Sequence, residues 1–236
     1  MLVLSLPESV PEGIRAWLLP LDLATPIEDA DWNLLSEEER SRAERFHHHA
    51  DCVRMAATRA ALRCQLGERL GCEPSSLCFE LGPNDKPRLK QKSTPAFNVS
   101  HSGEYALIAV SAVPFVASLG IDIEQQVTGL EFENLAEYAF TSVEREFLKQ
   151  CNESSDKSLG LHYESTFFLN WVAKEAVLKA VGVGISEHLQ AVSIHTLNNG
   201  QWVVEHENTD WPPLHVCRLK APQGYSAAIA WQVRER

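Results

Sequence analysis

The sequence is poor in the features that export, membrane insertion and nucleic-acid binding require. Basic residues number 21 against 32 acidic ones, a formal net charge of −11. This argues against non-specific binding to nucleic acid or an anionic membrane, because both need clustered Lys and Arg. No stretch approaches the roughly 20 apolar residues of a membrane span. The apolar start has no basic region before it and is interrupted by Pro7 and Pro11, so we predict no signal peptide.

Cysteines are few and widely spaced. None of the six forms a CxxC pair, a spacing common in zinc and redox sites. Without a predicted export signal, such cysteines indicate reduced thiols in a cytoplasmic protein, and we expect no zinc site. They are Cys52, Cys64, Cys72, Cys78, Cys151 and Cys217.

What the sequence does contain is an ordinary globular composition, 44% hydrophobic and 22% charged, with both helical and strand patterns. A first helix is predicted from Ser36, because Glu39 completes a capping-box spacing. Further helices are expected at 51–70, in an insertion at 130–150 and at 167–181, with a polar loop at 151–160. Strands are expected at 14–23, 77–81, 97–99, 105–111, 119–124, 191–196, 202–205, 214–219 and 224–233.

The order of these elements repeats weakly along the chain, and the last strand, 224–233, takes the place that residues 103–110 have earlier. We therefore predict an α+β fold of two pseudo-symmetric halves, residues 1–118 and 119–236. Short strands joined by tight turns favour small antiparallel sheets, because parallel strands need crossovers of about a dozen residues.

The segment 167–181 predicts a helix that is apolar on nearly every side and is therefore buried. Glu175 lies on the same part of the helical wheel as Trp171 and Val172, with Lys179 one turn later. A buried carboxylate is costly unless it is paired or binds a metal. A simple i,i+4 pair of Glu175 and Lys179 is the plain alternative, but such pairs belong on solvated faces. We interpret Glu175 as a functional carboxylate.

The strand 119–124 carries two more carboxylates. Side chains alternate along a strand, so Asp122 and Glu124 share one face while Ile121 and Ile123 share the other. Alone, this pattern favours a solvated strand face. Together with Glu175 it predicts an oxygen-rich site for a hard cation such as Mg²⁺, which keeps water and phosphate oxygens as further ligands.

Cationic and donor groups that could bind a phosphate are also present. Lys179 lies one turn after Glu175, and Ser100 and His101 are predicted in a tight turn before Gly103. Arg54 lies on the helix 51–70, and Lys86 and Arg88 follow a turn. Each of these residues alone is more often a surface charge than a ligand.

Three motifs in order then point to a family. They are FNVSHSG at 97–103, GIDIE at 120–124 and WVAKEAVLK at 171–179. In this combination the chain, from about residue 35 to 233, resembles the two-domain, Sfp-type 4′-phosphopantetheinyl transferases. The resemblance implies an active site in the cleft between the two halves.

The resemblance also implies a function: Mg²⁺-dependent transfer of the 4′-phosphopantetheine group of coenzyme A to a serine of an apo acyl or peptidyl carrier protein, with release of 3′,5′-ADP. Mn²⁺ would be a substitute metal. We expect a monomer, because the duplicated plan already provides both walls of the cleft, and the cysteines indicate a cytoplasmic enzyme. By the same resemblance, Asp122, Glu124 and Glu175 correspond to the metal ligands and Lys179 and His101 to pyrophosphate contacts. Nucleotide contacts would be Arg42, Arg54, Lys86 and Ser100, and catalytic roles would fall to Glu144, as the base, and to Lys174, Lys179 and Glu175.

The chain departs from the family pattern near the nucleotide. Asp85 replaces the Gly of a Gly-Lys-Pro motif, and Glu39 and Met55 stand where some members have Lys and Thr near the 3′-phosphate. Two other function classes stay open: a catalytically silent protein that binds coenzyme A or a carrier protein, and a metal-dependent phosphohydrolase.

Overall fold

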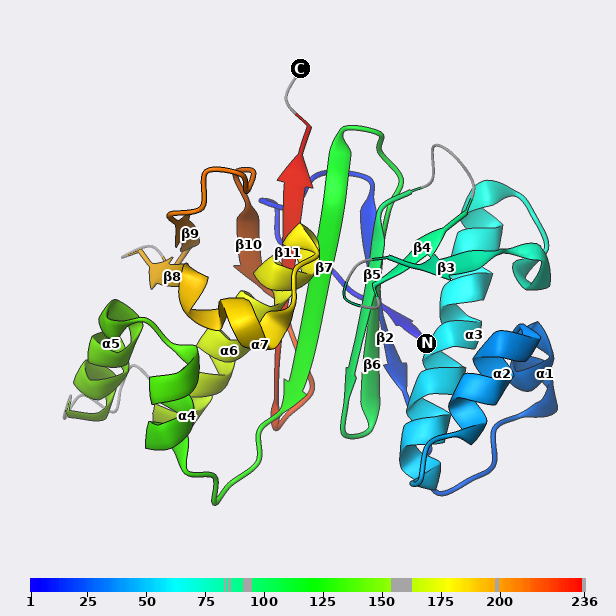
Figure 1. Ribbon diagram of the computed structural model, residues 1–236, viewed down its shortest axis with the longest axis horizontal. Coiled ribbons are helices and arrows are strands. Elements are labelled where there is room, and N and C mark those ends of the chain that lie inside the picture. Colours follow the sequence, from blue (N-terminus) through cyan, green and yellow to red (C-terminus); the bar gives the residue numbers. More distant parts are fainter. Residues whose placement is uncertain (83, 85, 91–94, 154–162, 198–199, 235–236) are drawn as a thin grey trace.

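The computed structural model describes residues 1–82, 84, 86–90, 95–153, 163–197 and 200–234. Two small antiparallel sheets lie side by side at the centre, and helices cover their outer flanks (Figure 1). The α+β prediction is confirmed. Asp85, most of the predicted loop 151–160 and part of the turn before Gly200 lie outside the described residues. In the described part of the chain no helix has the length and apolarity that a membrane span needs.

The first sheet has the order β1-β2-β6-β5, and α3 packs on its outer face, joined by α1, α2 and the hairpin β3-β4 (Figure 1). The helix α3 ends where predicted, because Gly71 adopts the left-handed conformation, φ 67°, that closes helices. The elements are β1 (Leu2–Val3), β2 (Ile14–Pro20), α1 (Asp29–Leu34), α2 (Glu37–Glu44), α3 (His49–Leu70), η1 (Pro74–Ser76), β3 (Phe79–Leu81), β4 (Pro87–Leu89), β5 (Phe97–Ser102) and β6 (Tyr105–Ser111).

The second sheet has the order β10-β11-β7, and the buried helix α6 packs against it with α4, α5 and the hairpin β8-β9 beyond (Figure 1). The predicted burial of the 167–181 helix is confirmed, since twelve of the residues of α6 are buried. The elements are β7 (Val116–Gln125), α4 (Phe132–Ala139), α5 (Ser142–Glu153), α6 (Tyr163–Val181), α7 (Ile185–His188), η4 (Leu189–Ala191), β8 (Val192–Thr196), β9 (Trp202–His206), β10 (His215–Arg218) and β11 (Tyr225–Val233).

The two halves repeat one plan. Each begins with a strand (β2 or β7), continues through short helices into a long one (α3 or α6), and then forms a two-stranded hairpin and a final pair of strands. The sheet orders β2-β6-β5 and β7-β11-β10 match element for element. The boundary predicted at 118/119 lies inside β7, which begins at Val116, and the domain division itself stays a prediction.

Ile121 and Ile123 belong to the apolar contact through which the two sheets pack together. Both are fully buried in an apolar cluster that also contains Leu18 and Leu107 of the first sheet. The cluster therefore lies between the sheets, and the opposite face of β7 is left for Asp122 and Glu124, as the alternation predicted.

Two local predictions were wrong. The loop expected at 151–160 begins too early, because α5 continues to Glu153. Ser100 and His101 do not lie in a turn but in β5, where they pair with Leu107 and Ala106 of β6. Only Gly103 and Glu104 form the turn, because Gly103, at φ 54°, reverses the chain at once. The backbone N–H groups of Ser100 and His101 thus lie in a strand and not in an anion-binding turn.

Candidate functional site

Three carboxylates from two elements meet at one point. Asp122 and Glu124 project from β7, and Glu175 projects from α6. One oxygen of each lies within 4.8 Å of the others. Asp122 is fully buried and Glu175 is 9% exposed. The structure thus brings together the three residues that the sequence predicted as metal ligands.

Gly120 allows α6 to approach β7 this closely. A Cβ atom at Gly120 would lie 1.9 Å from the carbonyl oxygen of Ala176 and 2.6 Å from the backbone nitrogen of Ala180. Such contact with helix backbone is impossible for any other residue without moving the helix. Since Glu175 adjoins Ala176, the missing side chain at Gly120 sets the distance between Glu175 and the carboxylates of β7.

Lys179 and two serines of β5 hold one oxygen of each carboxylate. The Lys179 ammonium lies 2.5 Å from Asp122 Oδ1 and 3.5 Å from Glu175 Oε2. Ser100 donates to Asp122 Oδ1 at 2.7 Å. Ser102 donates to Glu124 Oε2, also at 2.7 Å. The strand of the first half therefore contacts the carboxylates of the second.

The cluster is electrostatically strained. Burial, and then the charge of Asp122, raise the pKa of Glu175 to about 8 and that of Glu124 to about 7. Burial opposes the charge of Lys179, but the nearby carboxylates, Asp122 foremost, outweigh it and raise the pKa of the ammonium. One cation beside three acidic groups leaves an excess of negative charge, which a divalent cation would offset.

The donor set fits a hard divalent cation. Asp122 Oδ2 is buried and has no hydrogen-bond partner among the described residues. A buried polar atom without a partner is costly, and a metal ion is one of the few groups that would satisfy it. Carboxylate oxygens are the ligands that Mg²⁺ prefers. Asp122, Glu124 and Glu175 are therefore the residues that would hold Mg²⁺.

Lys86 ties the two halves together near this site. Its ammonium donates to the carbonyl oxygens of Leu119 on β7 and Lys179 on α6. Burial, and then the charge of Arg88, lower the pKa of Lys86 to about 8. The ammonium thus supports the backbone beside the carboxylates, while its assignment to the nucleotide stays a prediction.

His101 and Arg54, two of the predicted phosphate contacts, lie on the other side of β5. Alternation places His101 on the same side as Phe97, which packs in the cluster under α3, and opposite to Ser100. Arg54 donates to the carbonyl of Gly103 at 2.8 Å and pairs with Asp51 at 2.7 Å. The side chains of Ser100 and His101, which are adjacent in sequence, therefore lie on opposite faces of β5.

A cavity of about 640 Å³ opens between α2, α3 and the hairpin β3-β4. Arg42, predicted as a nucleotide contact, lines it together with Met55, but so does Arg59, which the sequence reasoning missed. The Arg59 guanidinium stacks 4.5 Å from the ring centre of Phe79 and lies 3.4 Å from Glu39. Spacing was the available signal, because residues i and i+4 such as 55 and 59 share a helix face.

Glu39 has a structural role in this wall. Its side chain closes the capping box with Ser36, accepting the Ser36 N–H at 2.9 Å. It also bonds the buried Arg63, whose Nε lies 2.9 Å away. The carboxylate thus neutralises part of an arginine cluster instead of projecting alone into the cavity.

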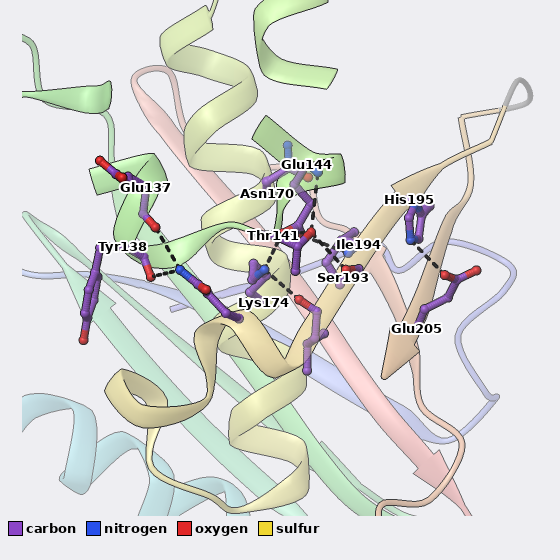
Figure 2. A network of polar contacts seen from close by, with 12 residues as sticks. Glu137, Tyr138, Thr141, Glu144, Asn170, Lys174, Ser193, Ile194, His195 and Glu205 are labelled. Carbon is purple, nitrogen blue, oxygen red and sulfur yellow. Dashed lines mark hydrogen bonds and ion pairs between the residues drawn. The ribbon is translucent and has the colours of Figure 1, made fainter. Parts of the chain in front are cut away.

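Glu144 lies in a separate buried network, shown in Figure 2. One carboxylate oxygen accepts bonds from the backbone and hydroxyl of Thr141 and from the Lys174 ammonium. The other accepts the Ile194 N–H at 2.8 Å. Lys174 also donates to the Val192 carbonyl at 2.7 Å. Within the part of the chain that the structure describes, neither Glu144 nor Lys174 contacts a metal-site carboxylate through these bonds.

A proton-accepting role for Glu144 does not fit these contacts. The residue is 2% exposed and both its oxygens are occupied. Thr141 and Glu144 have capping-box spacing at the start of α5, a signal in the sequence that favours a structural role. These contacts favour a structural role for Glu144 and Lys174 over the predicted catalytic one.

Two protein-family models match this chain. Residues 118–230 match the model of the 4′-phosphopantetheinyl transferase superfamily, and residues 28–113 match that of the 4′-phosphopantetheinyl transferase N-terminal region. A Synechocystis sp. protein provisionally assigned this activity is 34% identical over 228 residues, 94% of this chain and 88% of the relative. The chain belongs to the 4′-phosphopantetheinyl transferase superfamily.

Two further relatives carry the same activity in their names. The 4′-phosphopantetheinyl transferase HetI of Nostoc sp. is 33% identical over 180 residues, covering 75% of this chain and 71% of that protein. The 4′-phosphopantetheinyl transferase Sfp of Bacillus subtilis is 26% identical over 198 residues, covering 84% and 82%. The Sfp-type resemblance and the prediction of a transferase enzyme are confirmed.

Proposed function

We propose that this transferase moves the 4′-phosphopantetheine group of coenzyme A to a serine of an apo carrier protein, in a reaction that requires Mg²⁺ and accepts Mn²⁺. The observation that carries the proposal is the convergence of Asp122, Glu124 and Glu175, with Lys179 beside them. A pyrophosphate needs a divalent cation and a fixed positive charge nearby, and this cluster offers sites for both.

The reaction breaks the pyrophosphate bond of coenzyme A. The serine oxygen bonds to the phosphorus that carries phosphopantetheine, the serine proton passes to solvent water, and 3′,5′-ADP departs with the electron pair of the broken bond. Mg²⁺, when bound, offsets the charge of the pyrophosphate and of the leaving group. Lys179 supplies a second positive charge at that place, where charge redistributes as the bond breaks.

The nucleotide end of coenzyme A is proposed to lie on the first half. The cavity between α2, α3 and β3-β4 offers guanidinium groups from Arg42 and Arg59 and apolar surface from Met55 and Phe79. Phosphate and purine need these two kinds of surface. Arg54 and His101 would contact the phosphates on the outer side of β5, with Ser100 on the metal side.

The oligomeric state, cellular location and partner of the enzyme are also part of the proposal. Because one chain contributes both sheets and all the carboxylates, the protein needs no second copy to complete the site, and we propose a monomer. The six cysteines are free thiols, which supports a reducing, cytoplasmic environment. The partner is an acyl or peptidyl carrier protein, and no nucleic acid or membrane is involved.

The deciding experiment is mass spectrometry of a panel of apo carrier proteins incubated with coenzyme A and Mg²⁺. At least one carrier should gain one phosphopantetheine group, and chelation of the metal or Glu175→Gln should stop the gain. Coenzyme A binding without modification of any carrier would favour the silent binding protein. Free phosphopantetheine released without a carrier would favour the phosphohydrolase.

A further inference from the structure

Strands β5 and β7 are joined by side chains and not by a backbone ladder. They belong to different sheets, yet three alternate residues of β5 reach across to β7. Asn98 accepts the Ile121 N–H at 2.8 Å, and Ser100 and Ser102 donate to Asp122 and Glu124. The period of two along a strand places all three on one face, so the two serines stand opposite the two carboxylates of β7.

Each serine hydroxyl is oriented by a bond that it accepts. Ser102 Oγ accepts the backbone N–H of Gln125 at 3.1 Å, so its proton is directed to Glu124 Oε2 at 2.7 Å. Ser100 Oγ likewise accepts from Lys179 at 3.1 Å and donates to Asp122 Oδ1. A hydroxyl with one accepted and one donated bond has a fixed direction.

The bonded oxygens leave the others available. Glu124 Oε2 is held by Ser102, and this is the one side-chain hydrogen bond of that carboxylate in the described part of the chain. Asp122 shows the same division, with Oδ1 bonded and Oδ2 without a partner among described residues. Each carboxylate of β7 thus has one oxygen bonded to a serine of β5 and one that remains available as a ligand.

We infer that Ser102 is a positioning residue for the metal site: it holds Glu124 in the rotamer that directs one carboxylate oxygen at the cation, and Ser100 does the same for Asp122. The inference rests on the proposed function for the identity of the metal ligands. Hydrogen-bond partners of metal ligands typically contribute about 10- to 100-fold in metal affinity or activity. The first half of the chain would then shape a metal site whose ligands all come from the second half. Ser102 is the cleaner test of the two, because Ser100 is also proposed to lie near the phosphates.

The test is Mn²⁺ binding to the full-length protein, measured by electron paramagnetic resonance without coenzyme A. Ser102→Ala should weaken Mn²⁺ binding by about 10- to 100-fold. Ser102→Thr, which keeps the hydroxyl and suits a strand, should restore affinity to within about threefold of wild type. The control Ser118→Ala removes a hydroxyl of β7 that bonds Gln232 instead of a carboxylate and should leave Mn²⁺ binding unchanged.

A purely structural role predicts a different pattern. It would lower the melting temperature of Ser102→Ala without a selective loss of Mn²⁺ affinity. If Ser102→Ala folds poorly, Ser102→Cys takes its place, because it keeps the side-chain volume but has only a weak hydrogen-bond donor. Ser102→Cys should also weaken Mn²⁺ binding by about 10- to 100-fold. Wild-type Mn²⁺ affinity in Ser102→Ala or Ser102→Cys, or no rescue by Thr, would overturn the inference. Wild-type affinity in Glu124→Gln would instead remove Glu124 from the proposed metal site.

Discussion

Glu144 and Lys174, thirty residues apart, form an ion pair in which the two side chains are 1% and 0% exposed. The pair joins the start of α5 to the middle of α6, and both partners also bond the backbone of β8. Lys174 immediately precedes Glu175. The pair therefore fixes the segment of α6 that carries a proposed metal ligand, while its own groups are closed to a substrate.

Breaking this pair should destabilise the fold before it affects chemistry. Glu144→Gln or Lys174→Met leaves one charge buried without its partner, which costs about 3–5 kcal/mol. The double variant Glu144→Leu/Lys174→Met buries no charge and should recover part of that loss. Urea denaturation gives the free energies of unfolding. If Glu144→Gln unfolds like wild type but loses transfer, Glu144 acts in the reaction after all.

Gly120→Ala should separate the metal ligands. The added methyl group would lie 1.9 Å from the Ala176 carbonyl, so α6 must move away from β7, at a cost of about 1–3 kcal/mol or more. Mn²⁺ affinity and transfer should both fall, while thermal unfolding shows the stability loss. Gly184→Ala is the matched control, because its nearest contact is an ordinary 3.5 Å. Unchanged Mn²⁺ affinity in Gly120→Ala would refute the link between this glycine and the site.

The arginines that line the α2–α3 cavity should bind the 3′-phosphate of coenzyme A. Arg42→Gln and Arg59→Gln should each raise KM for coenzyme A by about 10-fold or more, the value of one charge-assisted hydrogen bond. Neither variant should affect dephospho-coenzyme A as strongly. Arg69→Gln, whose guanidinium bonds the Ala112 carbonyl, is the control. If both cavity variants prefer coenzyme A as wild type does, the 3′-phosphate lies elsewhere.

Lys179 should behave differently from these arginines. It is proposed to lie at the breaking bond, where charge redistributes, so Lys179→Met should lower kcat by about 100-fold or more. Its preference for coenzyme A over dephospho-coenzyme A should stay that of wild type. A change in KM alone would place Lys179 in uniform binding of the substrate and not at the transition state.

Stabilisation by Mg²⁺ should depend on pH. The pKa of Glu175 rises from an ordinary 4.5 to about 8 and that of Glu124 to about 7. Raised carboxylate pKa values mean that the folded protein binds more protons than the unfolded chain, so this part of the stability is lost as pH rises from about 4.5 to 8. Mg²⁺ needs the ionised form. The increase in melting temperature with Mg²⁺ should therefore be small near about pH 6, grow through pH 7 and 8, and level off above. A shift that is constant across this range would contradict the raised pKa values.

The sequence by itself determined the long helices, most of the strands and the faces of β7 and α6. Alternation along β7 separated Asp122 from Ile121, and the apolar surroundings of Glu175 indicated a buried carboxylate. These signals are local, because helix and strand periods act within a few residues. The ordered motifs then indicated the family.

Tertiary structure decided which groups meet. No local pattern around Glu144 predicts that it pairs with Lys174, and none around Ser102 predicts that it bonds Glu124. The first pair depends on how α5 packs on α6, and the second depends on how β5 lies against β7. Both arrangements rest on contacts between residues that are distant in the sequence, as does the packing of α6 on Gly120 of β7. Local periodicity assigns a side chain to a face of its element. Only the packing of the elements determines which side chain of another element that face contacts.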